Sequence, residues 1–174
     1  GAMFAPWRVG APRLSKTVGD IRRTLVSDED AERIATEFSL TWLSEVEHKT
    51  LSVNWPCIHG DLHGLNILMN EANRPLVIDF GDVGPGAASI DPVMLELSVL
   101  FHPAAGALRG EWPKPEQLSA WSRVEEFSAG CKYADYIKAC RKLANSVAAG
   151  NREIYASAYA YLLRQLKYKD TNKT

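Results

Sequence analysis

The chain has 174 residues, about the length of one domain, and its 20 Lys and Arg residues nearly balance 21 Asp and Glu residues, for a formal net charge of -1. This balance creates no overall field that would attract nucleic acid or an anionic membrane, so neither is expected as a partner. The three cysteines lack C-x-x-C spacing, which argues against a disulfide framework and a zinc ribbon, and no long apolar run or secretory pattern occurs. We therefore expect a protein of the cytoplasm.

The first 27 residues are predicted to contain little regular structure. Residues 1–3 are typical of what remains after a purification tag is cleaved. Residues 4–20 contain two prolines and two glycines and no sustained period, so we expect an extended or looped lead-in over residues 4–27. The folded domain is expected to span residues 28–170.

A helix is predicted from Ser27, a good N-cap that is followed by an acidic first turn. Ile34, Phe38, Trp42 and Val46 recur every four residues, as on one face of a helix, and Pro56 ends the segment. Two short apolar runs, residues 66–69 and 75–80, then flank the turn sequence NEANR and predict a small β-hairpin.

The rest of the chain is predicted to be helical. Residues 91–101 follow a loop rich in glycine, with Ser89 or Asp91 as the cap. Apolar residues recur at helical spacing from Leu118 to Val147, with an interruption near Gly130, and again over residues 152–169. The predicted fold class is α+β, mainly α-helical, with one small hairpin.

Polar side chains gather around that hairpin. His59, Asp61, His63 and Asn66 precede it within the stretch CIHGDLHGLNILMN, and Asp79 lies at the end of its second strand. Each of these residues taken alone is more often structural than catalytic. A hairpin brings its two ends together, however, and an amide oxygen with a few carboxylates suits magnesium bound to substrate phosphates. Together they indicate phosphoryl transfer.

The segments HGDLHGLN, VIDFGDVGPG and DPVMLELS resemble the C-terminal lobe of aminoglycoside phosphotransferase-like and choline kinase-like enzymes, which are relatives of protein kinases. The resemblance is strongest over residues 57–101. It implies that Asp61 is the catalytic base, and that Asn66 and Asp79 hold Mg2+ on the phosphates of ATP, with GTP as the alternative nucleotide. The acceptor is not identified.

The same resemblance implies supporting roles for neighbouring residues. His59 would brace the catalytic loop, and Asp91 would be the buried carboxylate that accepts hydrogen bonds from it. His63 would either contact the transferred phosphate or be structural, and Asp82 would face either the metal site or solvent. The sequence DPVMLE, with Glu96, also resembles kinase-like domains of bacterial signalling and conflict-system proteins.

Enzymes of this kind have an N-terminal lobe with a nucleotide-covering loop and a phosphate-binding Lys, but no G-x-G-x-x-G occurs here. We therefore expect a C-terminal lobe with the N-terminal lobe absent. Its partner would be the missing N-terminal lobe or other domains of a larger protein. Such a lobe would keep its metal ligands but bind ATP poorly and have little activity alone. Apolar surface left uncovered would be masked by Trp7 or Trp55, or would drive self-association.

Two other functions fit parts of the pattern. A non-catalytic kinase-like binding or scaffold module would retain the same ligands by descent. A metal-dependent hydrolase would use His59, Asp61 and His63 on one face of a strand, although no H-E-x-x-H motif occurs. Glu125, Glu126 and Asp135 could meet a cationic acceptor, but a solvated helix face is the favoured interpretation.

Overall fold

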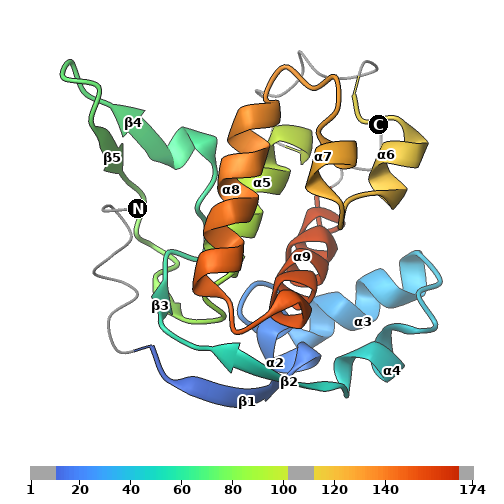
Figure 1. Ribbon diagram of the computed structural model, residues 1–174. Helices are drawn as coiled ribbons and strands as arrows, with labels where there is room; N and C mark the ends of the chain where they lie inside the picture. Colours follow the sequence, from blue (N-terminus) through green and yellow to red (C-terminus); the bar gives the residue numbers. More distant parts are fainter. Residues whose placement is uncertain (1–10, 102–111, 169–174) are drawn as a thin grey trace.

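The structure is a computed structural model that describes residues 11–101 and 112–168 (Figure 1). Residues 1–3 and Trp7 therefore lie outside the described residues. The helices are α2 (Val18–Arg23), α3 (Asp28–Glu37), α4 (Leu43–Glu47), α5 (Ile90–Phe101), α6 (Pro115–Ser119), α7 (Val124–Phe127), α8 (Ala134–Val147) and α9 (Asn151–Gln165), with a 3-10 turn, η1 (Gly64–Asn66). The strands are β1 (Arg13–Thr17), β2 (Thr50–Asn54), β3 (Cys57–Ile58), β4 (Ile67–Met69), β5 (Pro75–Val77) and β6 (Gly84–Pro85). The expected α+β class, mainly α-helical, is confirmed. Within the described ranges, no helix is both long and apolar enough to cross a membrane.

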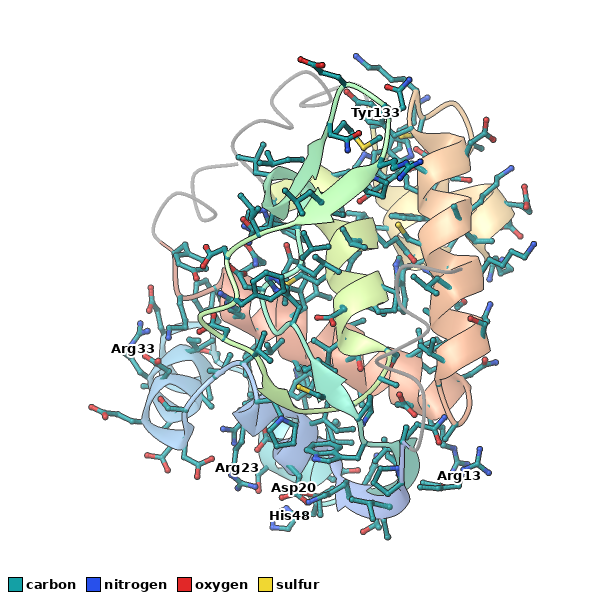
Figure 2. All side chains as sticks on the ribbon, turned by 90° about the vertical axis from the view of Figure 1, so that its left-hand side faces the viewer. Arg13, Asp20, Arg23, Arg33, His48 and Tyr133 are labelled. Atoms are coloured by element: carbon teal, nitrogen blue, oxygen red, sulfur yellow. The ribbon has the colours of Figure 1, made fainter. Side chains whose placement is uncertain are left out.

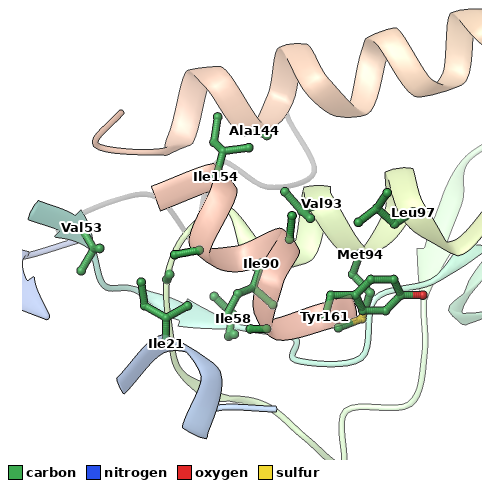
Figure 3. Close-up of a cluster of buried hydrophobic side chains, with 14 of the residues drawn as sticks. Ile21, Val53, Ile58, Ile90, Val93, Met94, Leu97, Ala144, Ile154 and Tyr161 are labelled. Carbon is green, nitrogen blue, oxygen red and sulfur yellow. The ribbon is translucent and has the colours of Figure 1, made fainter. Parts of the chain in front are cut away.

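Helix α5 forms the centre of the molecule, with α8 and α9 packed against it (Figure 1). All nine residues from Ile90 to Ser98 are buried, as the apolar run DPVMLELSVLF predicts. Its side chains meet those of α2, β2, β3 and α9 in the main core, which Figure 3 shows around Ile58, Ile90 and Tyr161. Each large apolar side chain buried there contributes roughly 1.5–3 kcal/mol to folding. The catalytic-loop segment thus begins beside a rigid core.

Within residues 4–27, expected to be extended or looped, residues 13–17 are extended and form β1, whereas residues 18–23 form the helix α2. Strand β1 pairs antiparallel with β2, with Leu14 opposite Val53. Thr17 then caps α2: its side chain accepts the Asp20 N–H at 3.0 Å, and the Asp20 carboxylate accepts the Thr17 N–H at 2.9 Å. Figure 2 shows Asp20 at the lower edge of the molecule beside Arg23, with which it also pairs. Both elements are too short to give a periodic signal.

The helix expected from Ser27 is interrupted rather than continuous. Helix α3 ends at Glu37, Ser39 has a left-handed φ of 55°, and the Leu40 N–H donates to the Ala35 carbonyl at 2.9 Å. This closing turn ends the helix before α4 begins at Leu43. The long helical region from Leu118 is likewise divided into α6, α7 and α8, and the interruption predicted near Gly130 is confirmed by its φ of 71°.

The predicted hairpin is confirmed as β4 and β5, with Ile67 opposite Val77 and Leu68 opposite Leu76. Its turn is closed by the Asn70 side chain, which accepts the N–H groups of Ala72 and Arg74. Side chains of paired residues share a face of the hairpin. Ile67 and Val77 accordingly pack inward on Leu62 and Leu95, whereas Leu68 and Leu76 lie on the outer, exposed face. The hairpin extends away from the helices (Figure 1).

Candidate active site

The loop from His59 to Asn66 joins β3 to the hairpin and carries most of the predicted site residues; we call it the catalytic loop. Its start is fixed by Asp91 of α5, whose carboxylate accepts the N–H groups of His59 at 2.8 Å and Gly60 at 3.0 Å. Burial raises the pKa of Asp91, whereas these two hydrogen bonds act in the opposite direction. The loop is therefore anchored to the central helix.

His59 is fully buried and links the loop to the hairpin. Its Nδ1 lies 3.3 Å from the Asp61 N–H and accepts from it, so its Nε2 carries the proton and donates to the Ile78 carbonyl at 2.9 Å. The ring also packs against Phe80, with ring centroids 5.3 Å apart. These contacts hold the imidazole away from solvent.

Gly60 allows the catalytic loop to touch the loop that follows β5, residues 79–83, which we call the metal loop. Its φ is +79°, and a Cβ at this position would lie 2.6 Å from the Asp82 carbonyl oxygen. A side chain would therefore be strained by both conformation and contact. The close approach places Asp61 next to the metal loop.

Asp61 projects from this contact with its side chain about a quarter exposed. Its Oδ1 lies 3.0 Å from Nη1 of Arg164, and its Oδ2 lies 3.7 Å from Nε2 of His63. His63 in turn accepts the Leu65 N–H through Nδ1, so the neutral ring presents its protonated Nε2 towards Asp61. His63 thus lies beside the predicted base.

Asn66 and Asp79 lie at the two ends of the hairpin, as predicted. The Ile78 N–H donates to the Asn66 carbonyl at 3.0 Å, so Asp79 follows directly after the residue that pairs with Asn66. The buried Asn66 side chain donates its amide to the Asp61 carbonyl at 2.8 Å. That bond commits the amide nitrogen and leaves the amide oxygen available for a cation.

Asp79 is one of the residues that could hold a metal ion. Its φ is 63°, unusual for a residue other than glycine, and its side chain is exposed. Within the described part of the chain it has neither a hydrogen bond nor an ion-pair partner for its carboxylate. An exposed carboxylate and an amide oxygen at adjoining ends of the hairpin could hold Mg2+, which binds through few protein oxygens and keeps several waters.

Arg164 is the residue of this site that the sequence did not reveal. It lies on α9, and its Nη1 also donates to the Gly60 carbonyl at 3.2 Å, across 104 residues of sequence. Burial, the largest effect, would lower the pKa of Arg164, but the charges of Asp61 and Asp82 and the interaction with Tyr168 together raise it. A helical pattern gives no sign of such a contact, because it depends on how α9 packs.

Two other acidic residues considered in the sequence analysis have basic partners. Asp82 is exposed and points towards Arg164, with Oδ2 and Nη2 3.9 Å apart. Glu96 is fully buried inside α5 and accepts from Nε of Arg141 and from Nε1 of Trp121, each at 2.8 Å. Burial raises the pKa of Glu96, opposed by these bonds. Glu96 therefore supports packing between α5 and α8.

The prediction that His59, Asp61 and His63 share one face of a strand, on which the hydrolase alternative depends, is wrong. Strand β3 ends at Ile58, so His59, Asp61 and His63 do not share a strand face, and both ring nitrogens of His59 have partners. In residues 11–101 and 112–168, no group of three His, Cys, Asp or Glu side chains could hold a metal ion. This absence does not bear on the predicted magnesium ligands Asn66 and Asp79, because Asn66 is not one of those four residue types.

A cavity of about 620 Å³ lies on another side of α9, between that helix, the segment joining α3 to α4, and the end of α6. Its walls are mainly aromatic, from Trp42, Phe101, Trp121, Tyr155 and Tyr159. It contains none of the predicted site residues. Glu125 and Glu126, considered above for a cationic acceptor, instead pair on the surface with Lys138 and Arg123.

Comparison with known proteins assigns the chain to a family. Residues 4–127 match the model of the APH phosphotransferase enzyme family, and the chain belongs to that family. Among solved structures, a glucosamine kinase (crystal form B) is similar, with 20% identity and a TM-score of 0.46, covering 92% of this chain. The chain spans only 44% of the length of that kinase. Among curated proteins, none matches the chain by sequence.

Proposed function

We propose that this chain is the catalytic lobe of a phosphotransferase that moves the γ-phosphate of ATP to a hydroxyl group of an acceptor. One observation carries the proposal: a single short network joins the predicted base to both predicted metal ligands. Asn66 donates to the backbone of Asp61 and accepts from the residue before Asp79. This network supports the proposal, because in-line phosphoryl transfer requires a base and metal ligands close together.

In this reaction Asp61 orients the acceptor hydroxyl and takes its proton. The hydroxyl oxygen forms a bond to the γ-phosphorus, the bond from that phosphorus to the bridging oxygen breaks, and ADP leaves with the electron pair. Asn66 and Asp79 would hold Mg2+, which would neutralise charge on the phosphates when bound. Asp91 and His59 keep the loop in place through the hydrogen bonds described above and touch no reacting atom.

The outer face of the hairpin supports a further part of the proposal. Leu68 is 48% exposed and Leu76 is 58% exposed, and Leu65 and Phe80 next to the site are more than half exposed. Apolar surface concentrated around a polar site is typical of a surface that something else covers. We propose that the remaining part of a larger cytoplasmic phosphotransferase covers this face, and that copies of the isolated chain self-associate through it.

Magnesium-dependent ATP binding, measured by calorimetry, tests the proposal. It should be measured for this chain and for the longest natural protein that contains it, each as the unchanged form, Asp79→Ala and Glu71→Ala. Glu71 is an exposed carboxylate in the turn of the same hairpin and serves as the matched control. In the longer protein we expect binding that depends on magnesium, weakens more than about 10-fold in Asp79→Ala, and is unchanged in Glu71→Ala; the present chain alone should bind ATP poorly.

The two chain lengths distinguish the remaining possibilities. Tighter binding by the longer protein would mean that the lobe needs its partner to hold the nucleotide. Absence of magnesium-dependent binding by both forms would contradict the proposal and favour a non-catalytic scaffold module. Equal loss of binding in Glu71→Ala and Asp79→Ala would show that the effect is not metal ligation.

A further inference from the structure

Arg164 contacts both loops of the candidate site at once. Its Nη1 lies 3.0 Å from Oδ1 of Asp61 and donates to the Gly60 carbonyl at 3.2 Å, and its Nη2 faces Asp82 of the metal loop at 3.9 Å. Its side chain is only 15% exposed. The guanidinium therefore bridges the catalytic loop and the metal loop where Gly60 approaches the Asp82 backbone.

The helix that carries Arg164 is firmly held. Ile154 and Tyr161 of α9 belong to the main core (Figure 3), and Leu163 is buried in a second apolar cluster. At the other end of α9, the fully buried Glu153 accepts N–H groups from Asn54, Ser89 and Ala149 at 2.7 to 3.1 Å. Because the helix cannot shift easily, the position of the guanidinium is set by the fold.

Two acidic side chains lie near the Arg164 guanidinium. Asp61, which is one quarter exposed, and the exposed Asp82 come from facing loops. Among the residues that the structure describes, Arg164 pairs with both of them, and no other Lys or Arg does. It holds Oδ1 of Asp61, so that Oδ2, beside His63, is the oxygen left to meet a substrate hydroxyl.

We infer that Arg164 is a positioning residue for the phosphoryl transfer proposed above, on which this inference rests. It aims the Asp61 carboxylate and keeps the catalytic loop against the metal loop. It acts through Asp61 and contacts neither Asn66 nor Asp79. Its loss should therefore slow the chemical step more than it weakens nucleotide binding.

Steady-state kinetics of the longest natural protein test this directly, with Arg164→Gln, Arg164→Lys and the control Arg152→Gln. Arg152 is an exposed arginine in the first turn of the same helix. We expect Arg164→Gln to lower kcat about 10- to 100-fold, because small displacements of a catalytic group have effects of this size. The KM for ATP should change less than about 3-fold, and Arg164→Lys should restore part of kcat. Arg152→Gln should have no effect.

A second comparison separates positioning from general loss of structure. In an Asp61→Asn background, Arg164→Gln should cause no further fall in kcat, because its effect passes through the carboxylate. Additive losses in the double variant, or an unchanged kcat in Arg164→Gln, would overturn the inference while leaving an active enzyme and the proposed function intact.

An activity-independent measurement covers the case in which the wild-type protein transfers no phosphate, which would count against the proposed function. The amide resonances of Gly60, Asp61 and Asp82 in the present chain should shift in Arg164→Gln, shift less in Arg164→Lys, and stay unchanged in Arg152→Gln. Unperturbed resonances at both loops in Arg164→Gln would overturn the assignment of Arg164.

Discussion

Gly60 allows a residue-scale test of how the site is built, because its replacement adds one methyl group at the contact between the two loops. Its φ of +79° is unfavourable for alanine, and the added Cβ would lie 2.6 Å from the Asp82 carbonyl. We expect Gly60→Ala to lower the free energy of unfolding by about 1–3 kcal/mol, measured by urea denaturation. It should also reduce magnesium-dependent ATP binding, because Asp79 belongs to the metal loop that Gly60 contacts.

Gly64→Ala is the matched control for this prediction. Gly64 lies four residues later in the same loop, and a Cβ there would meet nothing within 4 Å. Its replacement should change stability by less than about 0.5 kcal/mol. Equal effects of the two substitutions would indicate that Gly60 matters for loop entropy rather than for the contact with Asp82.

At the scale of elements, local patterns predicted what local forces determine. The hairpin was predicted because two short apolar runs flank a turn sequence. Helix α5 was predicted because a mainly apolar segment follows a capping residue. Strand β1 was missed because it exists only through its pairing with β2, far along the chain. The break after α3 was missed because Ser39 adopts a left-handed conformation, which is uncommon for serine and cannot be predicted from its residue type.

The candidate site shows the same division. Asp61, Asn66 and Asp79 lie within one hairpin and its approach, so their spacing alone places them together. Asp91 could be assigned only through the family resemblance, and Arg164 by neither route, because the packing of α9 brings it to Gly60 across 104 residues. Contacts between distant elements leave no periodic trace in the sequence.

Glu47 joins several of these elements and gives a prediction that depends on pH. Its carboxylate accepts Nε and Nη2 of the buried Arg22 at 2.8 and 2.7 Å, and Tyr159 of α9 donates to it at 2.7 Å. Burial would raise the pKa of Glu47, but the hydrogen bonds from Arg22 and Tyr159 and the charge of Arg22 lower it below 4.5. The unfolded chain therefore takes up this proton at higher pH than the folded protein does.

The stabilising effect of Glu47 is accordingly present above about pH 4.5 and is lost as the pH falls through the lower pKa of the folded state. We expect Glu47→Gln to reduce stability by about 1–3 kcal/mol at pH 7, with the deficit narrowing below pH 4.5. Urea unfolding at several pH values measures it. Glu45→Gln, on an exposed residue of the same helix, should cost less than about 0.5 kcal/mol; a deficit for Glu47→Gln that does not change with pH would contradict the assignment.

For the whole molecule, the exposed outer face of the hairpin and the near-zero net charge both favour self-association. A formal charge of -1 provides little repulsion between copies, while Leu68 and Leu76 present an apolar cross-strand pair to solvent. We expect the weight-average mass in sedimentation equilibrium to rise with protein concentration. Leu68→Glu with Leu76→Lys should abolish this rise, because the opposite charges can pair across the strands and leave the hairpin intact.

The comparison needs an apolar residue that is equally exposed elsewhere. Leu118 of α6 is 52% exposed and lies away from the hairpin, so Leu118→Glu should leave the self-association unchanged. A monomer at every concentration would contradict the proposal that this face drives association. Loss of association in Leu118→Glu as well would assign it to general surface hydrophobicity. Association that depends on the hairpin alone would support the proposal that the rest of a larger phosphotransferase packs on this face, because the same exposed apolar surface lies beside the candidate site.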